Sequence, residues 1–360
     1  MESNKKICFF VGSLCQGGAE RDVTIIANRL VADGYSVTIV LVFKNQIFFE
    51  LDKRINIVDW SNKFRNRKLF TILKLGKTIK KFHAENNFDY YLGNMIGLNC
   101  LIIKSLRKTN AKFIARIVSD PKAWGWKQKY FSKRLYPKAY KVVAQTKYQI
   151  DCFDGKLDKN YVVIPNICDY QIAIDAKKNY SSRCCIYVGR LNVNVKRLDL
   201  LIEGFNVFRK KHDDFKLLLF GEYPDDNGYS KGIIENTIEK LNASKHVYIK
   251  GPTKNVMEEL QKAFCFVFSS PHEGMPNAIL ESQLIGVPVI TSHFDGVEYI
   301  ISDNNDGLIY NFGNIDELAQ KIELLYDDES LYRKLSDEGI KRKALYREDR
   351  IIELFKGVFK

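Results

Sequence analysis

Two carboxylates, Glu273 and Glu281, lie eight positions apart on either side of a predicted helix start. The apolar run 265–269 before Glu273 predicts a buried strand, and Pro276 suits a first helical turn because its missing N–H is not needed there. The other N–H groups of that turn form an anion site, which Gly274 lets a ligand approach closely. Carboxylates on both sides of a phosphate site fit a nucleotide-sugar. Glu281 alone fits a solvated surface helix equally well, but the Glu-Gly-x-Pro context favours the binding site.

Two cations, Arg190 and Lys196, follow a second predicted strand, 184–188, which ends in Gly189. Gly189 lets the chain turn, and Lys196 is expected where a helical run begins. Arg can hold a diphosphate through paired hydrogen bonds, and Lys through its point charge. By themselves these two residues are typical of ordinary surface charge. Together with the two carboxylates they favour a diphosphate site.

A glycine-rich loop containing Gly17 and Gly18 opens a predicted helix over residues 19–32. It matches neither the dinucleotide-binding nor the P-loop pattern. Its backbone N–H groups can still hold a phosphate or a sugar. Glu298, which follows the predicted strand 287–291, fits either a surface carboxylate or a cleft residue.

The elements that must position these residues alternate between short apolar strands and amphipathic helices, which predicts parallel, doubly wound sheets. We expect an α/β protein of two Rossmann-like domains facing an interdomain cleft, with ligands beyond the carboxyl ends of the strands. The expected domains are 1–167 and 168–340, and a C-terminal helix, 341–360, is expected to pack back on the first. The predicted strands are 7–11, 36–42, 55–58, 90–92, 112–118, 142–145, 162–165, 184–188, 216–220, 247–250, 265–269, 287–291 and 307–310.

The charge of the chain is unevenly distributed. With 56 Lys and Arg against 43 Asp and Glu, the 360 residues carry a net charge of +13. Residues 1–180 carry +17 and residues 181–360 carry −4. This excess of positive charge suggests a polyanionic partner. Nucleic acid, an anionic membrane and a phosphorylated substrate are the three alternatives. Basic, aromatic and aliphatic residues interleave over 63–81 and 122–134, a mixture that suits a membrane interface. A solvated helix face explains 63–81 equally well.

The sequence lacks the usual signals for membrane insertion and secretion, which predicts a cytoplasmic protein. No apolar run approaches the ~18–20 residues of a membrane span, and the N-terminus lacks the apolar segment of a signal peptide. The eight cysteines form no C-x-x-C pair and are expected to be reduced, and the five histidines are scattered. We therefore expect no metal site.

The ordered set of motifs resembles the retaining family-4 glycosyltransferases, which have the two-domain GT-B fold. The glycine-rich N-terminal motif resembles the subset that builds bacterial surface glycans on polyprenyl diphosphate. The matching segments are Gly17-Gly-Ala-Glu-Arg21, Tyr187-Val-Gly-Arg-Leu191 with Lys196, Glu273 to Glu281, Gly286-Val-Pro-Val-Ile290 and Asp295-Gly-x-Glu298.

This resemblance implies roles for individual residues. Arg190 and Lys196 would bind the donor diphosphate and stabilise the leaving charge, and Glu273 would contact the hexose. These three are the expected catalytic residues. Glu281 would bind the ribose, and Gly251 would lie against the base. The expected donor-binding residues are Gly17, Gly18, Gly189, Gly251, Gly274, Met275, Pro276, Asn277, Ala278 and Glu281.

The chain also departs from the family pattern. Many members have a histidine near the sugar, in a loop where this chain reads Arg116-Ile-Val-Ser119-Asp120. Asp120 or Ser119 is the expected substitute, and the expected sugar or acceptor contacts are Arg116, Ser119, Asp120 and Glu298. No D-x-D motif follows a predicted strand, which favours a metal-independent reaction.

The expected function is that of a retaining hexosyltransferase. It would move a hexose or N-acetylhexosamine from a UDP-sugar to a polyprenyl-diphosphate-linked glycan of a bacterial surface polysaccharide, such as lipopolysaccharide O-antigen or capsule. UDP-sugar is a co-substrate, no cofactor is expected, and the basic N-terminal domain would meet the inner face of the cell membrane. A nucleotide-sugar epimerase of the same fold is an alternative that would act without acceptor. A nucleic-acid-binding protein is a second alternative, although no RRM, KH or zinc-finger signature is present, so nucleic acid is not an expected partner.

Overall fold

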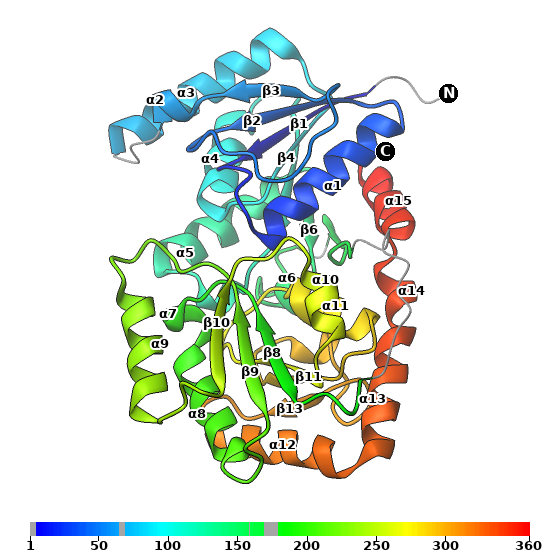
Figure 1. The fold of residues 1–360 in the computed structure, drawn as a ribbon. Helices are drawn as coiled ribbons and strands as arrows, with labels where there is room; N and C mark the ends of the chain where they lie inside the picture. Colours follow the sequence, from blue (N-terminus) through cyan, green and yellow to red (C-terminus); the bar gives the residue numbers. More distant parts are fainter. Residues whose placement is uncertain (1–4, 65–68, 158, 169–178) are drawn as a thin grey trace. The chain divides into compact units, whose positions relative to one another are not determined.

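The computed structural model describes residues 5–64, 69–157, 159–168 and 179–360 (Figure 1). The chain forms two compact units. Unit 1 comprises Met1–Ile167 and Glu348–Lys360, and unit 2 comprises Cys168–Arg347. The basic stretch 63–81 is described only in part, because residues 65–68 lie outside the described residues.

Unit 1 is built on a parallel sheet. Its described residues form seven strands in the order β3-β2-β1-β4-β5-β6-β7. The strands are β1 (Lys6–Val11), β2 (Ser36–Leu41), β3 (Asn56–Asp59), β4 (Tyr90–Gly93), β5 (Lys112–Ile117), β6 (Lys141–Ala144) and β7 (Tyr161–Val163). The helices are α1 (Gly18–Ala32), α2 (Ser61–Phe64), α3 (Leu69–Asn86), α4 (Ile96–Leu106), η1 (Pro121–Ala123), α5 (Trp126–Leu135), η2 (Tyr136–Lys138), α6 (Lys147–Asp151) and α15 (Glu348–Val358).

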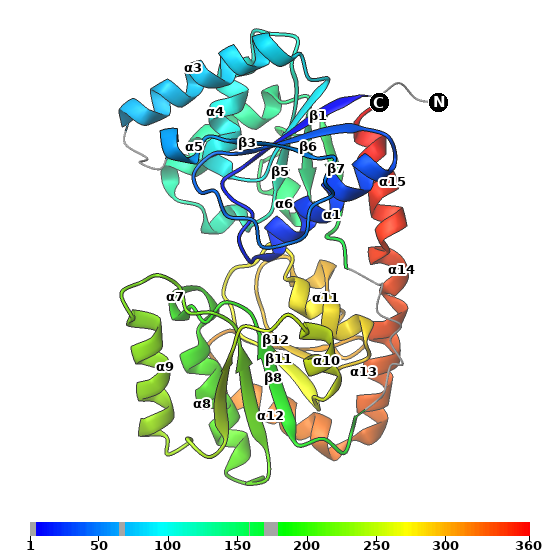
Figure 2. The ribbon, with the colours of Figure 1, turned by 45° about the horizontal axis from the view of Figure 1, so that its top comes forward.

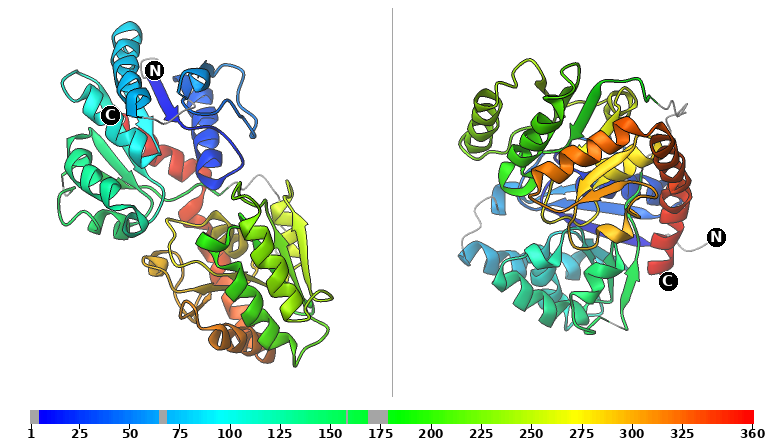
Figure 3. Two further views of the ribbon diagram at one scale, coloured as in Figure 1. Left: turned by 90° about the vertical axis from the view of Figure 1, so that its left-hand side faces the viewer. Right: turned by 90° about the horizontal axis from the view of Figure 1, so that it is seen from below.

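Helices cover both faces of this sheet (Figure 3), so its central strands are apolar along almost their whole length. In β1, Cys8 and Phe10 face one buried cluster while Ile7 and Phe9 face the other. Alternate residues of a strand point to opposite faces, and this alternation divides the core of unit 1 into two layers.

The C-terminal helix α15 belongs to the layer that contains α1. Ile351, Ile352 and Phe355 are buried in it, and Figure 2 shows the two helices side by side. Ion pairs between the Arg29 Nε and a Glu348 carboxylate oxygen, at 3.1 Å, and between Lys356 Nζ and an Asp33 carboxylate oxygen, at 2.6 Å, border this contact. The chain therefore returns to unit 1 after completing unit 2.

Unit 2 repeats the order of the first six strands of unit 1. Its described residues form a six-stranded parallel sheet in the order β10-β9-β8-β11-β12-β13. The strands are β8 (Cys184–Val188), β9 (Lys216–Phe220), β10 (Val247–Gly251), β11 (Cys265–Phe268), β12 (Val289–Ser292) and β13 (Leu308–Tyr310). The helices are α7 (Val193–Lys196), α8 (Leu198–Arg209), α9 (Tyr229–Lys240), α10 (Val256–Gln261), α11 (Asn277–Leu284), η3 (Val297–Tyr299), α12 (Ile315–Asp327), α13 (Glu329–Lys341) and α14 (Lys343–Tyr346).

Two doubly wound parallel sheets confirm the predicted fold class. In each sheet the chain order reverses beside the first strand, between β1 and β4 in unit 1 and between β8 and β11 in unit 2. Ligands of open α/β sheets bind at such reversal points, beyond the carboxyl ends of the strands. Each unit therefore has one edge at which a ligand site is expected.

Candidate functional site

The predicted catalytic residues of unit 2 gather where its strand order reverses. Gly189 and Arg190 directly follow β8, and Glu273 follows β11, the neighbouring strand. Carboxyl ends of parallel strands meet at one sheet edge. Residues that are far apart in the chain are therefore brought to a single place.

Lys196 and Glu273 are in direct contact there. The Lys196 ammonium donates to the Glu273 carboxylate, and the two side chains are 17 % and 12 % exposed. Lys196 Nζ also lies 4.9 Å from the centre of the Phe268 ring. Arg190 is exposed. The site thus combines a half-buried ion pair with a solvent-facing guanidinium, a charge arrangement able to bind a phosphate and a hydroxyl-bearing ligand together.

Helix α7, which carries Lys196, is fixed against the loop that carries Glu273. Asn192 caps α7, because its side-chain oxygen accepts from the backbone N–H of Asn194 at 3.0 Å and of Val195 at 3.3 Å. Ser270 Oγ donates to the Val195 carbonyl at 2.9 Å. Sequence reasoning missed Ser270. Its only signal is a place two residues after the end of β11.

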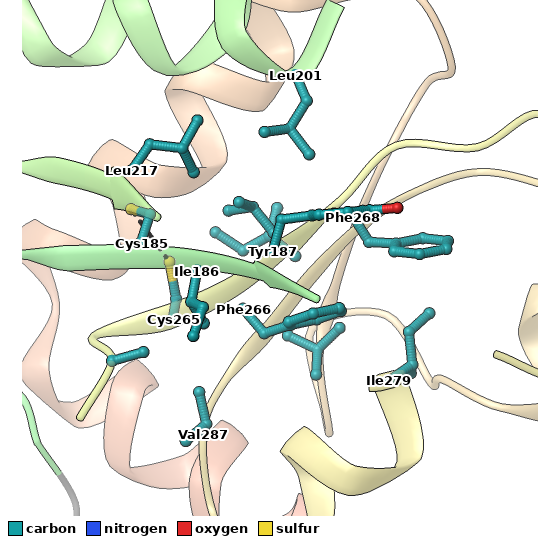
Figure 4. Close-up of a cluster of buried hydrophobic side chains, with 14 of the residues drawn as sticks. Cys185, Ile186, Tyr187, Leu201, Leu217, Cys265, Phe266, Phe268, Ile279 and Val287 are labelled. Atoms are coloured by element: carbon teal, nitrogen blue, oxygen red, sulfur yellow. Dashed lines mark hydrogen bonds between the residues drawn. The ribbon is translucent and has the colours of Figure 1, made fainter. Parts of the chain in front are cut away.

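Tyr187 supports the turn that presents Arg190. Its ring stacks on Phe268 with centroids 6.0 Å apart and planes at 15° (Figure 4), and its hydroxyl donates to the Arg190 carbonyl at 3.0 Å. Burial, with a contribution from the Glu273 charge, raises the pKa of Tyr187, so the hydroxyl remains a donor. Gly189 has a φ of +157°, and a Cβ there would lie 2.7 Å from the Tyr187 hydroxyl. The position therefore requires glycine.

The local structure at Lys196 differs from the prediction. Lys196 was expected where a helical run begins, but it is the last residue of α7. Arg197 interrupts the helical path with a φ of +43°, and α8 starts at Leu198. Left-handed backbone is uncommon for residues other than glycine, and hydrophobic periodicity does not reveal it. Lys196 therefore ends α7, where it contacts Glu273, and is not part of α8.

Backbone hydrogen bonds link the neighbouring strand ends around the site. The Gly221 N–H donates to the Gly251 carbonyl at 2.9 Å, and the Gly189 N–H donates to the Phe220 carbonyl at 3.0 Å. These bonds connect the ends of β8, β9 and β10. Gly251, the predicted contact for the base, is therefore connected through the Gly221 turn to the turn that precedes Arg190.

Helix α11 starts at Asn277, with Pro276 as its extended N-cap residue. Met275 and Pro276 are buried, whereas Gly274, Asn277 and Ala278 are half-buried. Glu281 lies in the second turn of α11 and is only 5 % exposed. A buried carboxylate is held by charged or hydrogen-bonding groups rather than by bulk water, so Glu281 is not a solvated surface residue. Glu298, on η3, is exposed.

In unit 1, Gly17 and Gly18 lie where α1 begins. Ser119 and Asp120 follow β5, and both have partners within the unit. Ser119 Oγ accepts from Trp124 Nε1 at 2.9 Å, and an Asp120 carboxylate oxygen accepts from the Tyr148 hydroxyl at 2.8 Å. Their predicted role as sugar or acceptor contacts remains a prediction.

Arg116 lies within β5 and points into the interior of unit 1. Its guanidinium is 3.4 Å from an Asp22 carboxylate oxygen, with the two side chains 1 % and 0 % exposed, and 5.1 Å from the centre of the Phe355 ring. Burial lowers the pKa of Arg116, while Asp22 opposes that effect. Arg116 therefore joins β5, α1 and α15, a structural role that the sequence did not indicate.

The described residues contain neither a metal-binding cluster nor a membrane-spanning helix. No group of three or more His, Cys, Asp or Glu side chains in this part of the chain is arranged to hold a metal ion. Among the helices that the structure describes, none combines the length and apolar character needed to cross a bilayer.

Part of the chain is also similar in sequence to a known protein family. Residues 172–342 match the family described as glycosyl transferases group 1. This match covers most of unit 2 and just under half of the chain. The family match includes Arg190, Lys196 and Glu273, whereas the candidate residues of unit 1 lie outside it.

Individual relatives of this chain extend over nearly its whole length. A Campylobacter jejuni protein is 23 % identical, covering 94 % of this chain and 93 % of its own. Its name is GalNAc-alpha-(1->4)-GalNAc-alpha-(1->3)-diNAcBac-PP-undecaprenol alpha-1,4-N-acetyl-D-galactosaminyltransferase. Sucrose-phosphate synthase from Thermosynechococcus elongatus has a similar structure, with a TM-score of 0.83, 18 % identity and coverage of 99 % and 98 %. Anabaena Alr3699/HepE in complex with UDP and glucose has a TM-score of 0.79, 15 % identity and 98 % coverage of both chains. These structural neighbours share the GT-B fold.

Proposed function

We propose that the protein is a retaining, metal-independent glycosyltransferase that moves a hexose or N-acetylhexosamine from a UDP-sugar to a polyprenyl-diphosphate-linked glycan. The acceptor would belong to a bacterial surface polysaccharide assembled at the inner face of the cell membrane. The observation that carries the proposal is the contact of Lys196 with Glu273, beside Arg190, at the strand reversal of unit 2.

The charges of this site match the parts of a nucleotide-sugar. Arg190 and Lys196 supply the cations that a diphosphate needs, and Glu273 supplies an acceptor for hexose hydroxyls. Glu281 is the proposed partner of the ribose, and the Gly251 segment is the proposed wall for the base. The similarity to a UDP-binding protein of the same fold supports uridine as the nucleoside.

The reaction would break the bond between the anomeric carbon and the terminal phosphate oxygen of the donor. A new bond forms between that carbon and an acceptor hydroxyl oxygen on the same face, and the hydroxyl proton passes to the departing phosphate. Negative charge accumulates on the leaving diphosphate, and fixed cations at that position lower the barrier. Arg190 and Lys196 take this role in the proposal, while Glu273 orients the hexose.

Unit 1 is the proposed acceptor unit. The Campylobacter jejuni relative is named for a glycan on undecaprenol diphosphate, which supports a lipid-linked acceptor here. The strongly basic first half of the chain, at +17, supports an anionic membrane as the surface on which unit 1 meets that lipid.

The site assignment is tested by single substitutions at the ion pair. Lys196→Ala and Glu273→Ala are each expected to reduce UDP release in the presence of a lipid-linked acceptor by on the order of 100-fold, because each removes a group aimed at the reacting atoms. The matched controls Lys240→Ala and Glu239→Ala lie at the end of α9 and should retain wild-type turnover. Turnover within a few-fold of wild type for both site variants would contradict the assignment.

A further inference from the structure

Unit 1 contains a pocket of about 470 Å³ that the proposed function has not used. It lies beyond the carboxyl ends of β5 and β6, where η1 and α6 follow these two strands, and α5 borders it. Its lining consists of Pro121, Lys122, Trp124, Lys129, Ser132, Lys133, Tyr148, Asp151, Cys152, Phe153 and Asp154.

The inner wall of the pocket is aromatic and fixed in place. Trp124 and Phe153 are buried and meet edge to face, with ring centroids 6.1 Å apart. The hydrogen bond from Trp124 to Ser119 and that from Tyr148 to Asp120, described above, hold two further sides of the wall. The polar atoms of this wall already have partners, so the ring surface of Tyr148 and the exposed edge of Trp124 offer the pocket an apolar contact, which favours hydrocarbon.

The rim of the pocket is mainly basic. Lys122, Lys129 and Lys133 line it, and the Lys122 ammonium lies 5.5 Å from the centre of the Tyr148 ring. Two carboxylates also line it, but each is paired with a lysine. Asp154 binds Lys133 at 2.6 Å, and Asp151 binds Lys147.

The surrounding sequence adds to this positive field. Thirteen of the residues 101–154 are Lys or Arg, against three acidic residues, Asp120, Asp151 and Asp154. Asp120 is itself buried. A ligand at the rim would therefore meet an excess of positive charge.

The outer face of α5, beside the pocket, exposes aromatic side chains. Trp126, Tyr130 and Phe131 are 75 %, 56 % and 49 % exposed. The helix contains Lys127, Lys129, Lys133 and Arg134 and no acidic residue. Aromatic rings combined with cations on one short helix are typical of a surface that rests in the headgroup layer of an anionic membrane.

We propose that this pocket binds an isoprenyl diphosphate while the outer face of α5 rests on the bilayer that contains the lipid. The diphosphate lies on the lysine rim and the first isoprene units lie against the Tyr148 ring and the edge of Trp124 that reaches the pocket. This inference rests on the proposed function, because it assigns a place in unit 1 to the carrier of the acceptor glycan. Ser119 and Asp120 then act as positioning residues that hold the pocket wall.

An amphipathic ligand explains features that simpler ligands leave unused. Free phosphate would use the lysines but not the aromatic wall, and a plain hydrocarbon would use the wall but not the lysines. Lysine provides a compact point charge that suits a phosphate. Each half of the proposed ligand thus has its own counterpart in the pocket.

Calorimetry with soluble probes tests the pocket. The full-length protein should bind farnesyl diphosphate, and should bind inorganic diphosphate or farnesol at least about tenfold more weakly, since each probe keeps only half of the interactions. Lys129→Ala should weaken the binding of farnesyl diphosphate by about tenfold, which is the expected loss for one charge-assisted hydrogen bond. Lys138→Ala, an exposed lysine on η2 outside the pocket, should leave the affinity unchanged. Both variants must unfold at the wild-type temperature for the comparison to count.

The outcomes separate this inference from the proposed function. Equal affinity for inorganic and farnesyl diphosphate would reduce the pocket to an unspecific phosphate site and overturn the inference. Unaltered binding by Lys129→Ala would overturn it too. UDP binding, measured on the same samples, reports on unit 2. Protein that binds UDP but no farnesyl diphosphate would refute the pocket alone, whereas failure to bind UDP would refute the proposed donor site.

Vesicle sedimentation tests the α5 face. Vesicles of phosphatidylcholine and phosphatidylglycerol should bind the wild-type protein. The triple variant Trp126→Ser, Tyr130→Ser, Phe131→Ser should bind on the order of tenfold more weakly, because its apolar contact with the interface is lost. Tyr229→Ser removes an equally exposed aromatic from unit 2 and serves as the control. Equal vesicle binding by the triple variant and the control would overturn the assignment of α5.

Discussion

At the scale of single residues, the negative charge of Glu273 in its ion pair with Lys196 should have opposite effects on binding of the nucleoside diphosphate and on transfer of the sugar. In the proposed reaction the Glu273 carboxylate would orient the hexose, but its charge would also repel a diphosphate and offset the charge of the Lys196 ammonium that it contacts. Binding of the bare nucleoside diphosphate and transfer of the sugar should therefore respond differently when this charge is removed.

Glu273→Gln should bind UDP about three- to tenfold more tightly than wild type, because about 1 kcal/mol of repulsion disappears at this half-buried position. Its rate of sugar transfer should fall. Titration calorimetry with UDP measures the first effect, and Glu239→Gln on α9 is the matched exposed control. A weaker affinity for UDP would mean that Glu273 holds Lys196 in position for the diphosphate instead of competing with it.

The buried pair of Arg116 and Asp22 leads to a prediction about stability. Arg116→Met should reduce the free energy of unfolding by about 3–5 kcal/mol, because it removes a buried cation that faces the buried Asp22 carboxylate. Adding Asp22→Asn should recover part of the loss. Chemical denaturation measures both variants, and Arg134→Met, an exposed arginine on α5, should change stability by less than about 0.5 kcal/mol. If Arg116→Met also lowered the free energy of unfolding by less than about 0.5 kcal/mol, the structural role assigned to Arg116 would be wrong.

At the scale of elements, the strand ends of unit 2 depend on two glycines in close contact. Gly221 has a φ of +152°, and a Cβ there would overlap the carbonyl oxygen of Gly189. Because the Gly189 turn presents Arg190, any shift that relieves the overlap also moves the proposed diphosphate site.

Gly221→Ala should reduce the free energy of unfolding by more than about 1 kcal/mol and should also weaken UDP binding. Gly232→Ala provides the comparison, since Gly232 lies in α9 with no atom within 4 Å of an added Cβ. That variant should gain about 0.4–1 kcal/mol and bind UDP normally. Thermal unfolding and calorimetry check the two variants. A stable Gly221→Ala protein with normal affinity would show that the turn tolerates a side chain.

Sequence reasoning located most strands within two residues because apolar runs bounded by glycine and polar residues are strong signals. It also placed Arg190 and Glu273 just after two strands, β8 and β11, which the structure shows to be neighbours. It could not find the break at Arg197, because a left-handed residue other than glycine leaves no trace in hydrophobic periodicity. It did not find the burial of Arg116 either, since that depends on Asp22, whose position in the chain is remote.

At the scale of the whole chain, the uneven charge separates two kinds of partner. The excess of +17 lies in residues 1–180, and the −4 half contains the proposed donor residues with only a few placed cations. A surface partner held by many cations is sensitive to salt, because the range of the electrostatic field shrinks to a few Å at high ionic strength.

Binding to vesicles that contain phosphatidylglycerol should therefore be lost by ~0.5 M salt. Vesicles of pure phosphatidylcholine should bind weakly at every salt concentration. Sedimentation over a salt series measures both, and RNA in place of vesicles provides the comparison for the nucleic-acid alternative. Binding that persists at high salt would indicate a mainly apolar attachment, and equal affinity for RNA would revive that alternative.

The most direct test of sugar transfer is UDP release from a panel of UDP-sugars, with and without a polyprenyl-diphosphate-linked glycan, followed by analysis of the lipid product. We predict that one UDP-sugar releases UDP only when the lipid-linked acceptor is present, and that the acceptor gains one sugar. Conversion of a UDP-sugar to its epimer without acceptor, or UDP release that leaves the lipid unchanged, would contradict the proposed transfer.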